Sequence, residues 1–316
     1  MSDGSSGGLR LSKNSGTRVS KNERREAARE KARALRDRHR KKEKRTRYLL
    51  QGGIILAVIA AVAVVAVIIT SSVRPPASGP RNMLSDGIVI GPDFIAATTP
   101  GLDAGAEPVA TPANPEVLAI RVYLDYLCPD CGDFEKANSE QIATLVDEGV
   151  ATVEIHPVAI LDRVSQGSRY STRAANAAAC VAEYSPNSFF DFNSAMYKAQ
   201  PEENTTGLTD DELISIAEGV GMAQRSKVAT CIKGLEFEQW VEDSTGRAAD
   251  DPDLQGAQGF ATPAIFVNGT RFTGNVADPT EFAQFLASAD GEASAVESTA
   301  SPSPSPPPAP PAPPAP

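Results

Sequence analysis

The sequence predicts an α/β domain with an inserted group of helices, between a hydrophobic N-terminal segment and a Pro-rich C-terminal tail. Three observations support this fold class. A run of branched and aromatic residues at 117–127 is typical of a strand and ends directly at Cys128 and Cys131. An alternating strand pattern follows at 151–158 after a helical segment, which indicates a right-handed crossover between parallel strands. The Asn-Gly pair at 268–269 is a hairpin signal between two short strand patterns.

Residues 1–48 are predicted to form a basic tail without a core. The first 47 residues contain 17 Lys and Arg against 6 Asp and Glu, although the whole chain has a net charge of -10. Such a basic run can bind nucleic acid. We favour a cytoplasmic segment next to a membrane, where the charges fix topology and contact anionic lipid, because of the segment that follows.

The next segment, 49–70, has the composition of a transmembrane helix. Positions 49 to 69 contain no charged residue, and this length is sufficient to cross a bilayer. Because Lys and Arg are concentrated before the span, we expect a single-pass protein with its N-terminus in the cytoplasm and its body outside. A cleaved signal peptide is the alternative, but the long preceding extension and the lack of a clear cleavage signal argue against it. Residues 71–82 are Pro-rich and are predicted to be a linker.

The folded domain is predicted to cover residues 83–289. A short edge strand is expected at 88–90. The helix after the two cysteines is expected to run through 135–146 and to end before Gly149. His156, at the end of the strand at 151–158, has two interpretations, a catalytic residue or a structural one, and we favour the structural one.

Five helices are predicted within an insert covering about 168–249. Thr209 and Glu212 have the spacing of a capping box. Cys180 and Cys231 each fall in one of these helices, and outside the membrane two such cysteines are more often paired than free, so we expect a structural disulfide. Two buried thiols or a second redox pair are the alternatives. The predicted helices cover residues 169–184, 188–199, 210–220, 223–232 and 237–249.

The domain is predicted to close with a hairpin and a helix. Strand patterns at 264–267 and 270–273 flank the Asn-Gly pair. Pro263 precedes the first of them, where a cis peptide bond is plausible. A last helix is expected at 279–287, and residues 290–316 are rich in Ser, Pro and Ala and are predicted to be disordered or extended.

Cys128 is the candidate nucleophile. A cysteine between a strand and a helix lies at the helix N-terminus, where free N–H groups and the helix dipole favour a thiolate. Pro129 suits the first helical position, and Cys131 is one turn further along, as a resolving thiol would be. A zinc site can use the same spacing but needs two further ligands, and Cys180 and Cys231 are isolated in the sequence.

These motifs together resemble a known family. The segments YLDYLCPDC at 123–131 and TPAIFVNG at 262–269, with helices between them, are similar to those of DsbA-type thiol-disulfide oxidoreductases of the thioredoxin fold. More narrowly, the chain resembles membrane-anchored DsbA-like proteins of actinobacteria. The resemblance covers about 83–289. It implies that Cys128 attacks, that Cys131 resolves and that Pro263 is the cis-proline. It also implies that Thr262 pairs with the substrate backbone and tunes the Cys128 thiolate.

Two positions depart from the family pattern. Ala261 replaces a common glycine, which we expect to be tolerated. Asp130 stands where DsbA-type oxidases often have a histidine, and we expect its carboxylate to raise the pKa of Cys128. A less stable thiolate would make the disulfide a weaker oxidant. Oxidase, reductase and isomerase therefore all remain compatible with the sequence.

The resemblance also implies the reaction partners. Substrates would be reduced secreted or cell-envelope proteins, and a quinone-linked membrane oxidase of the DsbB or vitamin-K-epoxide-reductase type would reoxidise the enzyme. We expect no metal, no organic cofactor and no nucleic acid. The alternative from another class is a membrane-tethered binding or scaffold protein whose cysteine pair is structural.

Overall fold

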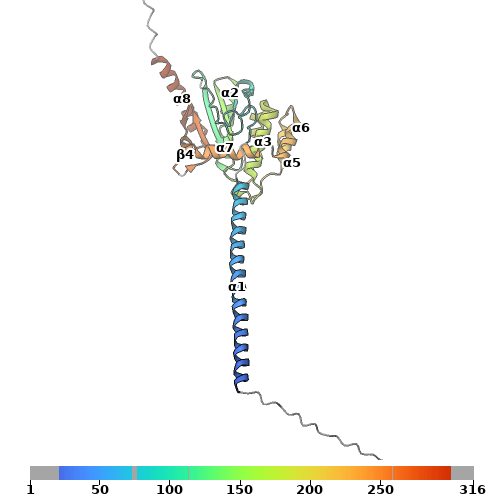
Figure 1. The fold of residues 1–316 in the computed structure, drawn as a ribbon. Coiled ribbons are helices and arrows are strands. Elements are labelled where there is room, and N and C mark those ends of the chain that lie inside the picture. The colour runs from blue at the N-terminus through green and yellow to red at the C-terminus, as the bar shows by residue number, and fades with distance from the viewer. Residues whose placement is uncertain (1–20, 73–76, 113, 258, 300–316) are drawn as a thin grey trace, which may run out of the picture. The chain divides into compact units, whose positions relative to one another are not determined.

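The computed structural model describes residues 21–72, 77–112, 114–257 and 259–299. The chain divides into two compact units, Met1–Arg74 and Pro75–Pro316. The first unit contains helix α1, Lys21–Ser72 (Figure 1).

Within the described residues, no helix combines the length and the apolar character needed to cross a membrane. Most side chains of the segment predicted to span the membrane, 49–70, lie outside the described residues, as do residues 1–20 of the predicted basic tail. The membrane span therefore stays a prediction.

A five-stranded sheet forms the centre of the second unit, in the order β1-β3-β2-β6-β7. The central strands β2 and β3 are parallel, and every other neighbouring pair is antiparallel. Helix α2 connects β2 to β3, which confirms the predicted crossover. The predicted edge strand at 88–90 is also confirmed. The strands are β1 Ile88–Ile90, β2 Leu118–Leu124, β3 Ala151–Pro157, β6 Ala264–Val267 and β7 Thr270–Arg271.

Strand β2 ends at Leu124, three positions earlier than the apolar run suggests. The reason is a turn at Asp125, whose side chain accepts a hydrogen bond from the N–H of Leu127 at 2.9 Å. Such side-chain to backbone bonds compete with strand pairing. The turn leaves residues 125–128 as a short loop between β2 and the first turn of α2.

Two helices pack together beside one face of the sheet: α2, Pro129–Asp147, and α8, Pro279–Thr299. The rings of Phe134 and Phe282 join them edge to face at 5.3 Å. Helix α8 continues past its predicted end at 287 and into the tail predicted to begin at 290, because Ala and Glu in this stretch favour helix. Residues 300–316 lie outside the described residues.

The insert consists of five helices built around α3. Residues 174–182 of α3 are completely buried, and α3 contacts each of the other four helices. A disulfide joins Cys180 in α3 to Cys231 in α6, with the Cα atoms 5.8 Å apart. The predicted capping box begins α5. The helices are α3 Tyr170–Tyr184, α4 Phe189–Lys198, α5 Asp210–Gly219, α6 Arg225–Gly234 and α7 Glu238–Asp250. Figure 1 labels α3, α5, α6 and α7.

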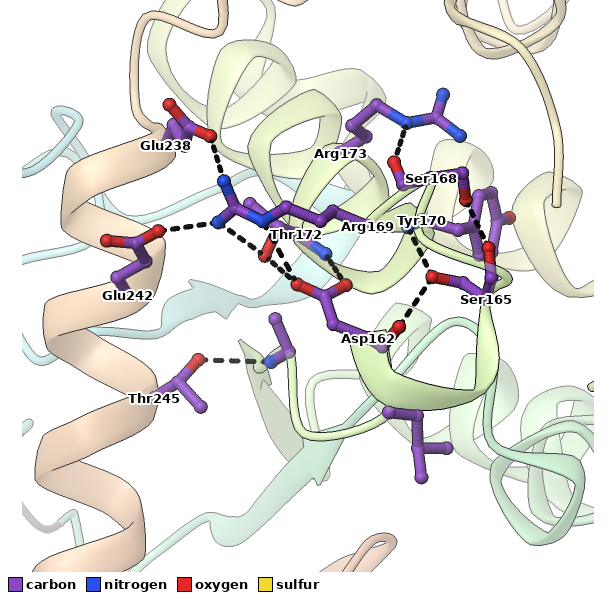
Figure 2. Close-up of polar contacts among 12 residues, drawn as sticks. Asp162, Ser165, Ser168, Arg169, Tyr170, Thr172, Arg173, Glu238, Glu242 and Thr245 are labelled. Atoms are coloured by element: carbon purple, nitrogen blue, oxygen red, sulfur yellow. Dashed lines mark hydrogen bonds and ion pairs between the residues drawn. The ribbon is translucent and has the colours of Figure 1, made fainter. Parts of the chain in front are cut away.

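Arg169, directly before α3, forms ion pairs and hydrogen bonds with α7 (Figure 2). Its guanidinium donates to Glu238 and Glu242 on α7, and its Nε lies 3.6 Å from Asp162. Asp162 in turn accepts from the backbone N–H of Thr172 at 3.0 Å. These contacts hold the last helix of the insert against the domain from which the insert emerges.

Several short elements were not predicted from the sequence. They are the 3-10 turns η1 Pro92–Phe94, η2 Asp162–Val164, η3 Pro186–Ser188 and η4 Pro252–Leu254, and the two-stranded ribbon of β4 Gln255–Gly256 and β5 Gly259–Phe260.

Candidate active site

The two cysteines lie at the start of α2. Cys128 is the N-cap residue and Pro129 follows at the first helical position. The N–H of Cys128 donates to the carbonyl of Asp125 at 2.9 Å, and the carbonyl of Cys128 accepts from the N–H of Gly132 at 3.2 Å. Both cysteines are free thiols, and their exposed fractions are 5% for Cys128 and 2% for Cys131. This placement puts the Cys128 sulfur beside the positive end of the helix dipole.

The electrostatics distinguish the two sulfurs. The pKa of Cys128 is lowered, chiefly by a hydrogen bond from the Cys131 thiol and further by Thr262, while burial works in the opposite direction. The pKa of Cys131 is raised well above its ordinary value, mainly by burial. At neutral pH the site thus favours a thiolate at Cys128 and keeps the proton on Cys131.

A segment distant in sequence completes the site. The peptide bond between Thr262 and Pro263 is cis. As a thiol, Cys128 donates from Sγ to the carbonyl oxygen of Thr262 at 3.2 Å. The Thr262 hydroxyl is buried and has no hydrogen-bond partner in the described part of the chain, so it is available to donate to the thiolate. Pro263 also lines, with Cys131, a small cavity of about 20 Å³.

The pKa of Cys128 is lowered overall, although the Asp130 carboxylate is expected to raise it. Asp130 is exposed on the first turn of α2. The carboxylate that opposes ionisation of Cys128 is Asp125. Solvent screens an exposed carboxylate, whereas a buried one acts through a medium of low dielectric constant.

The sequence reasoning missed Asp125 as a site residue. Its side chain is fully buried, and burial raises its pKa to about 6 despite hydrogen bonds from the N–H groups of Leu127, Leu161 and Ile160. An acidic residue directly after an apolar strand and three positions before Cys128 is the signal that could have identified it.

Three other residues singled out from the sequence lie away from the two cysteines of the site. His156 is buried on the face of the sheet opposite to these cysteines, where it pairs in register with Tyr123 and stacks on its ring with the centroids 4.2 Å apart. Its Nε2 lies 3.5 Å from Glu154. These contacts support the structural interpretation. Cys180 and Cys231 form the disulfide of the insert.

A zinc site at Cys128 and Cys131 would need further ligands from other parts of the chain. Among the residues that the structure describes, no three or more His, Cys, Asp or Glu side chains are grouped so that they could hold a metal ion.

The chain is similar to several known proteins. The family model described as Thioredoxin matches residues 114–287. Reduced DsbG of Mycobacterium tuberculosis, described as a disulfide bond oxidoreductase, is 31% identical and is matched over 86% of its length and 58% of this chain, with a TM-score of 0.46. Oxidised DsbA of the same organism is 28% identical, matched over its full length and 68% of this chain, with a TM-score of 0.49.

A third relative is a much longer protein. The serine/threonine-protein kinase PknE of Mycobacterium tuberculosis is 30% identical over 171 residues. The match covers 53% of this chain and only 29% of the kinase. The chain therefore spans less than a third of the length of this relative.

Fold, site and sequence relationship together define a DsbA-like thiol-disulfide oxidoreductase with the thioredoxin fold. The family match covers more than half of the chain, and the chain belongs to the thioredoxin family.

Proposed function

We propose that the chain is a membrane-anchored, extracytoplasmic enzyme that forms or exchanges disulfides in secreted and cell-envelope proteins through Cys128 and Cys131. The observation that carries this proposal is the opposite perturbation of the two thiols. The N-terminal sulfur has a lowered pKa and the buried one a raised pKa. A sulfur that is stable as a thiolate is both an effective nucleophile and a good leaving group.

Disulfide donation begins from the oxidised Cys128–Cys131 pair. A substrate thiolate attacks Cys128 Sγ, a mixed disulfide forms, and Cys131 leaves as a thiolate. Cys131 then takes up a proton, as its raised pKa favours. A second substrate thiolate attacks the substrate sulfur of the mixed disulfide and expels Cys128 as a thiolate, which its lowered pKa stabilises. Two electrons pass from the substrate dithiol to the enzyme, which is left reduced.

The reduced enzyme needs an electron acceptor. We propose a quinone-linked membrane oxidase of the DsbB or vitamin-K-epoxide-reductase type, because a membrane-anchored enzyme outside the cytoplasm would share the bilayer with such a partner. Thr262 and Pro263 form the edge on which an extended substrate would pair, since they adjoin Cys128 and the Thr262 carbonyl already contacts its sulfur.

The proposed location depends on how the chain is divided into a tail, a membrane span, a linker and a catalytic domain. Residues 1–48 would be the cytoplasmic tail, 49–70 the membrane span, 71–82 the linker, 83–289 the catalytic domain and 290–316 the tail. The charge asymmetry around the uncharged span supports this orientation. A protease-sensitive tag added at the C-terminus should be digested in intact cells, and protection of the tag would contradict the topology.

Trapping substrates tests the activity. A Cys131→Ala variant of the full chain should accumulate mixed disulfides through Cys128, detectable as adducts by mass spectrometry after non-reducing separation. Cys128→Ser is the matched control and should trap nothing. If Cys128→Ser retains full exchange activity on a reduced secreted protein, the enzyme proposal fails and the scaffold alternative is favoured.

The direction of the reaction requires a separate measurement. Equilibration of the Cys128–Cys131 pair with glutathione gives its reduction potential. A value well above that of thioredoxin, about −270 mV, supports an oxidase or isomerase. A value close to that of thioredoxin would favour a reductase.

A further inference from the structure

The end of α4 makes three side-chain hydrogen bonds to the loop at 125–128. Tyr197 donates from its hydroxyl to the carbonyl of Asp125 at 3.3 Å. Gln200, just past the end of the helix, donates from Nε2 to the carbonyl of Tyr126 at 3.2 Å and to the carbonyl of Cys128 at 2.8 Å. The insert therefore contacts the backbone that carries the nucleophile directly.

Gly132 makes this contact sterically feasible. A Cβ atom at position 132 would lie 2.1 Å from Oε1 of Gln200, which is too close for any two heavy atoms that are not bonded. Glycine inside a helix costs stability relative to alanine. Its occurrence in the first turns of α2 is explained by the space that the Gln200 side chain occupies.

We propose that Gln200 is a positioning residue for Cys128. The inference rests on the proposed thiol-disulfide chemistry and adds to it a control of thiolate stability by the insert. Stabilisation by a helix dipole falls off within the first turn, so it depends on where the N-cap residue is held. One amide group of Gln200 donates to the carbonyls of both Tyr126 and Cys128 and so fixes the backbone of the N-cap residue. The positive end of the Gln200 amide dipole then points toward this backbone.

The inference predicts a change in both the thiolate and the redox equilibrium. Gln200→Met keeps a long, unbranched side chain but removes both hydrogen bonds. We expect the pKa of Cys128 to rise and the equilibrium with glutathione to shift about two- to fivefold toward the oxidised enzyme, the range that corresponds to a helix-terminus interaction. The disulfide would become a weaker oxidant, because the reduced form loses stabilisation.

Gln224→Met is the matched control. Gln224 also donates from Nε2 to a backbone carbonyl at 2.8 Å, that of Tyr184, but on a different part of the insert. Both variants of the full chain are reduced, and the Cys128 thiolate is titrated by its ultraviolet absorbance before equilibration with glutathione. If Gln200→Met changes the pKa and the equilibrium no more than Gln224→Met does, the inference is overturned.

Gly132→Ala keeps the test decisive if Gln200→Met fails to fold, because it leaves Gln200 in place, and a double-mutant cycle extends this test. Gly132→Ala displaces the Gln200 amide while improving helix propensity, and should raise the pKa of Cys128. In a Gln200→Ala background the same methyl group meets no amide, so Gly132→Ala should then have no effect. An equal effect in both backgrounds would overturn the inference. Absence of exchange activity in the unmodified chain would instead defeat the proposed function, while the thiolate titration would still decide the role of Gln200.

Discussion

Asp125 should make the domain less stable as the pH rises. The side chain is fully buried beside the cysteine pair. Its carboxylate accepts hydrogen bonds from the N–H groups of Leu127 at 2.9 Å, Ile160 at 2.9 Å and Leu161 at 3.0 Å. These bonds offset only part of the cost of burying a charge, because the pKa of Asp125 is still raised from 3.8 to about 6.

The magnitude follows from this difference in pKa. A rise from 3.8 to about 6 corresponds to roughly 3 kcal/mol of free energy of unfolding. Because the folded-state pKa is the higher one, the folded protein binds the proton more tightly. This stability is fully present below about pH 4 and is lost as the pH rises through about 6.

The assay compares urea unfolding of the unmodified chain and of Asp125→Asn across this pH range. Trp240 is the only tryptophan of the chain and is 1% exposed, so its fluorescence reports unfolding of the domain. The free energy of unfolding of the unmodified chain minus that of Asp125→Asn should decrease by roughly 2 to 3 kcal/mol between about pH 4 and about pH 7. The variant can be more or less stable overall, since only the change with pH is compared.

Glu154→Gln provides a control of opposite sign. Burial works against ionisation of Glu154, but contacts with His156 and Arg121 and a hydrogen bond from Ser85 hold its pKa well below the ordinary value. Its contribution to stability is therefore present above about pH 4 and is lost as the pH falls. The free energy of unfolding of the unmodified chain minus that of Glu154→Gln should increase as the pH rises towards about 4 and should stay nearly level from there to about pH 7. If the unmodified chain and Asp125→Asn give parallel stability curves from about pH 4 to about pH 7, the reasoning about Asp125 is refuted.

Three further predictions follow from other contacts. In the reduced chain, iodoacetamide at neutral pH should alkylate Cys128 much faster than Cys131, because their pKa values are shifted in opposite directions; equal labelling by mass spectrometry would contradict this. Replacing both Cys180 and Cys231 by alanine should lower the free energy of unfolding by about 4 kcal/mol, the chain-entropy value for their separation of 51 residues. Exchange activity should be retained at a temperature at which the variant stays folded. Loss of activity without loss of stability would indicate a redox role for the pair. Thr209→Ala should cost about 1 kcal/mol, because it removes the capping box of α5; an unchanged urea midpoint would show that the box adds nothing.

Features set by local sequence were predictable. The apolar strand before Cys128, the crossover to the strand at 151–158 and the helices of the insert all follow from hydrophobic periodicity, which the chain carries along its length. The capping box at Thr209 and the turn at Asn268 depend on a few neighbouring residues, so they too could be recognised before the structure was known.

The individual groups that act on the pKa of Cys128 could not all be predicted in this way. Asp130 is the closest acidic residue in sequence, but the carboxylate that opposes ionisation of Cys128 in the fold is Asp125. Besides Cys131, the groups that lower the pKa of Cys128 include the side chain of Thr262, 134 residues away in the sequence. Gln200 also approaches the loop at 125–128 from the insert. No spacing rule brings these positions together, because their proximity depends on how the sheet and the insert pack.

The sequence by itself determined the class of chemistry, since a cysteine pair between a strand and a helix places a sulfur at a helix N-terminus wherever that unit occurs. Only the tertiary structure decided which carboxylate is buried beside that sulfur and which backbone groups surround it. The physical reason is that ionisation depends on exclusion of water and on the donors and acceptors within a few ångströms. Both are fixed by packing between segments far apart in the chain.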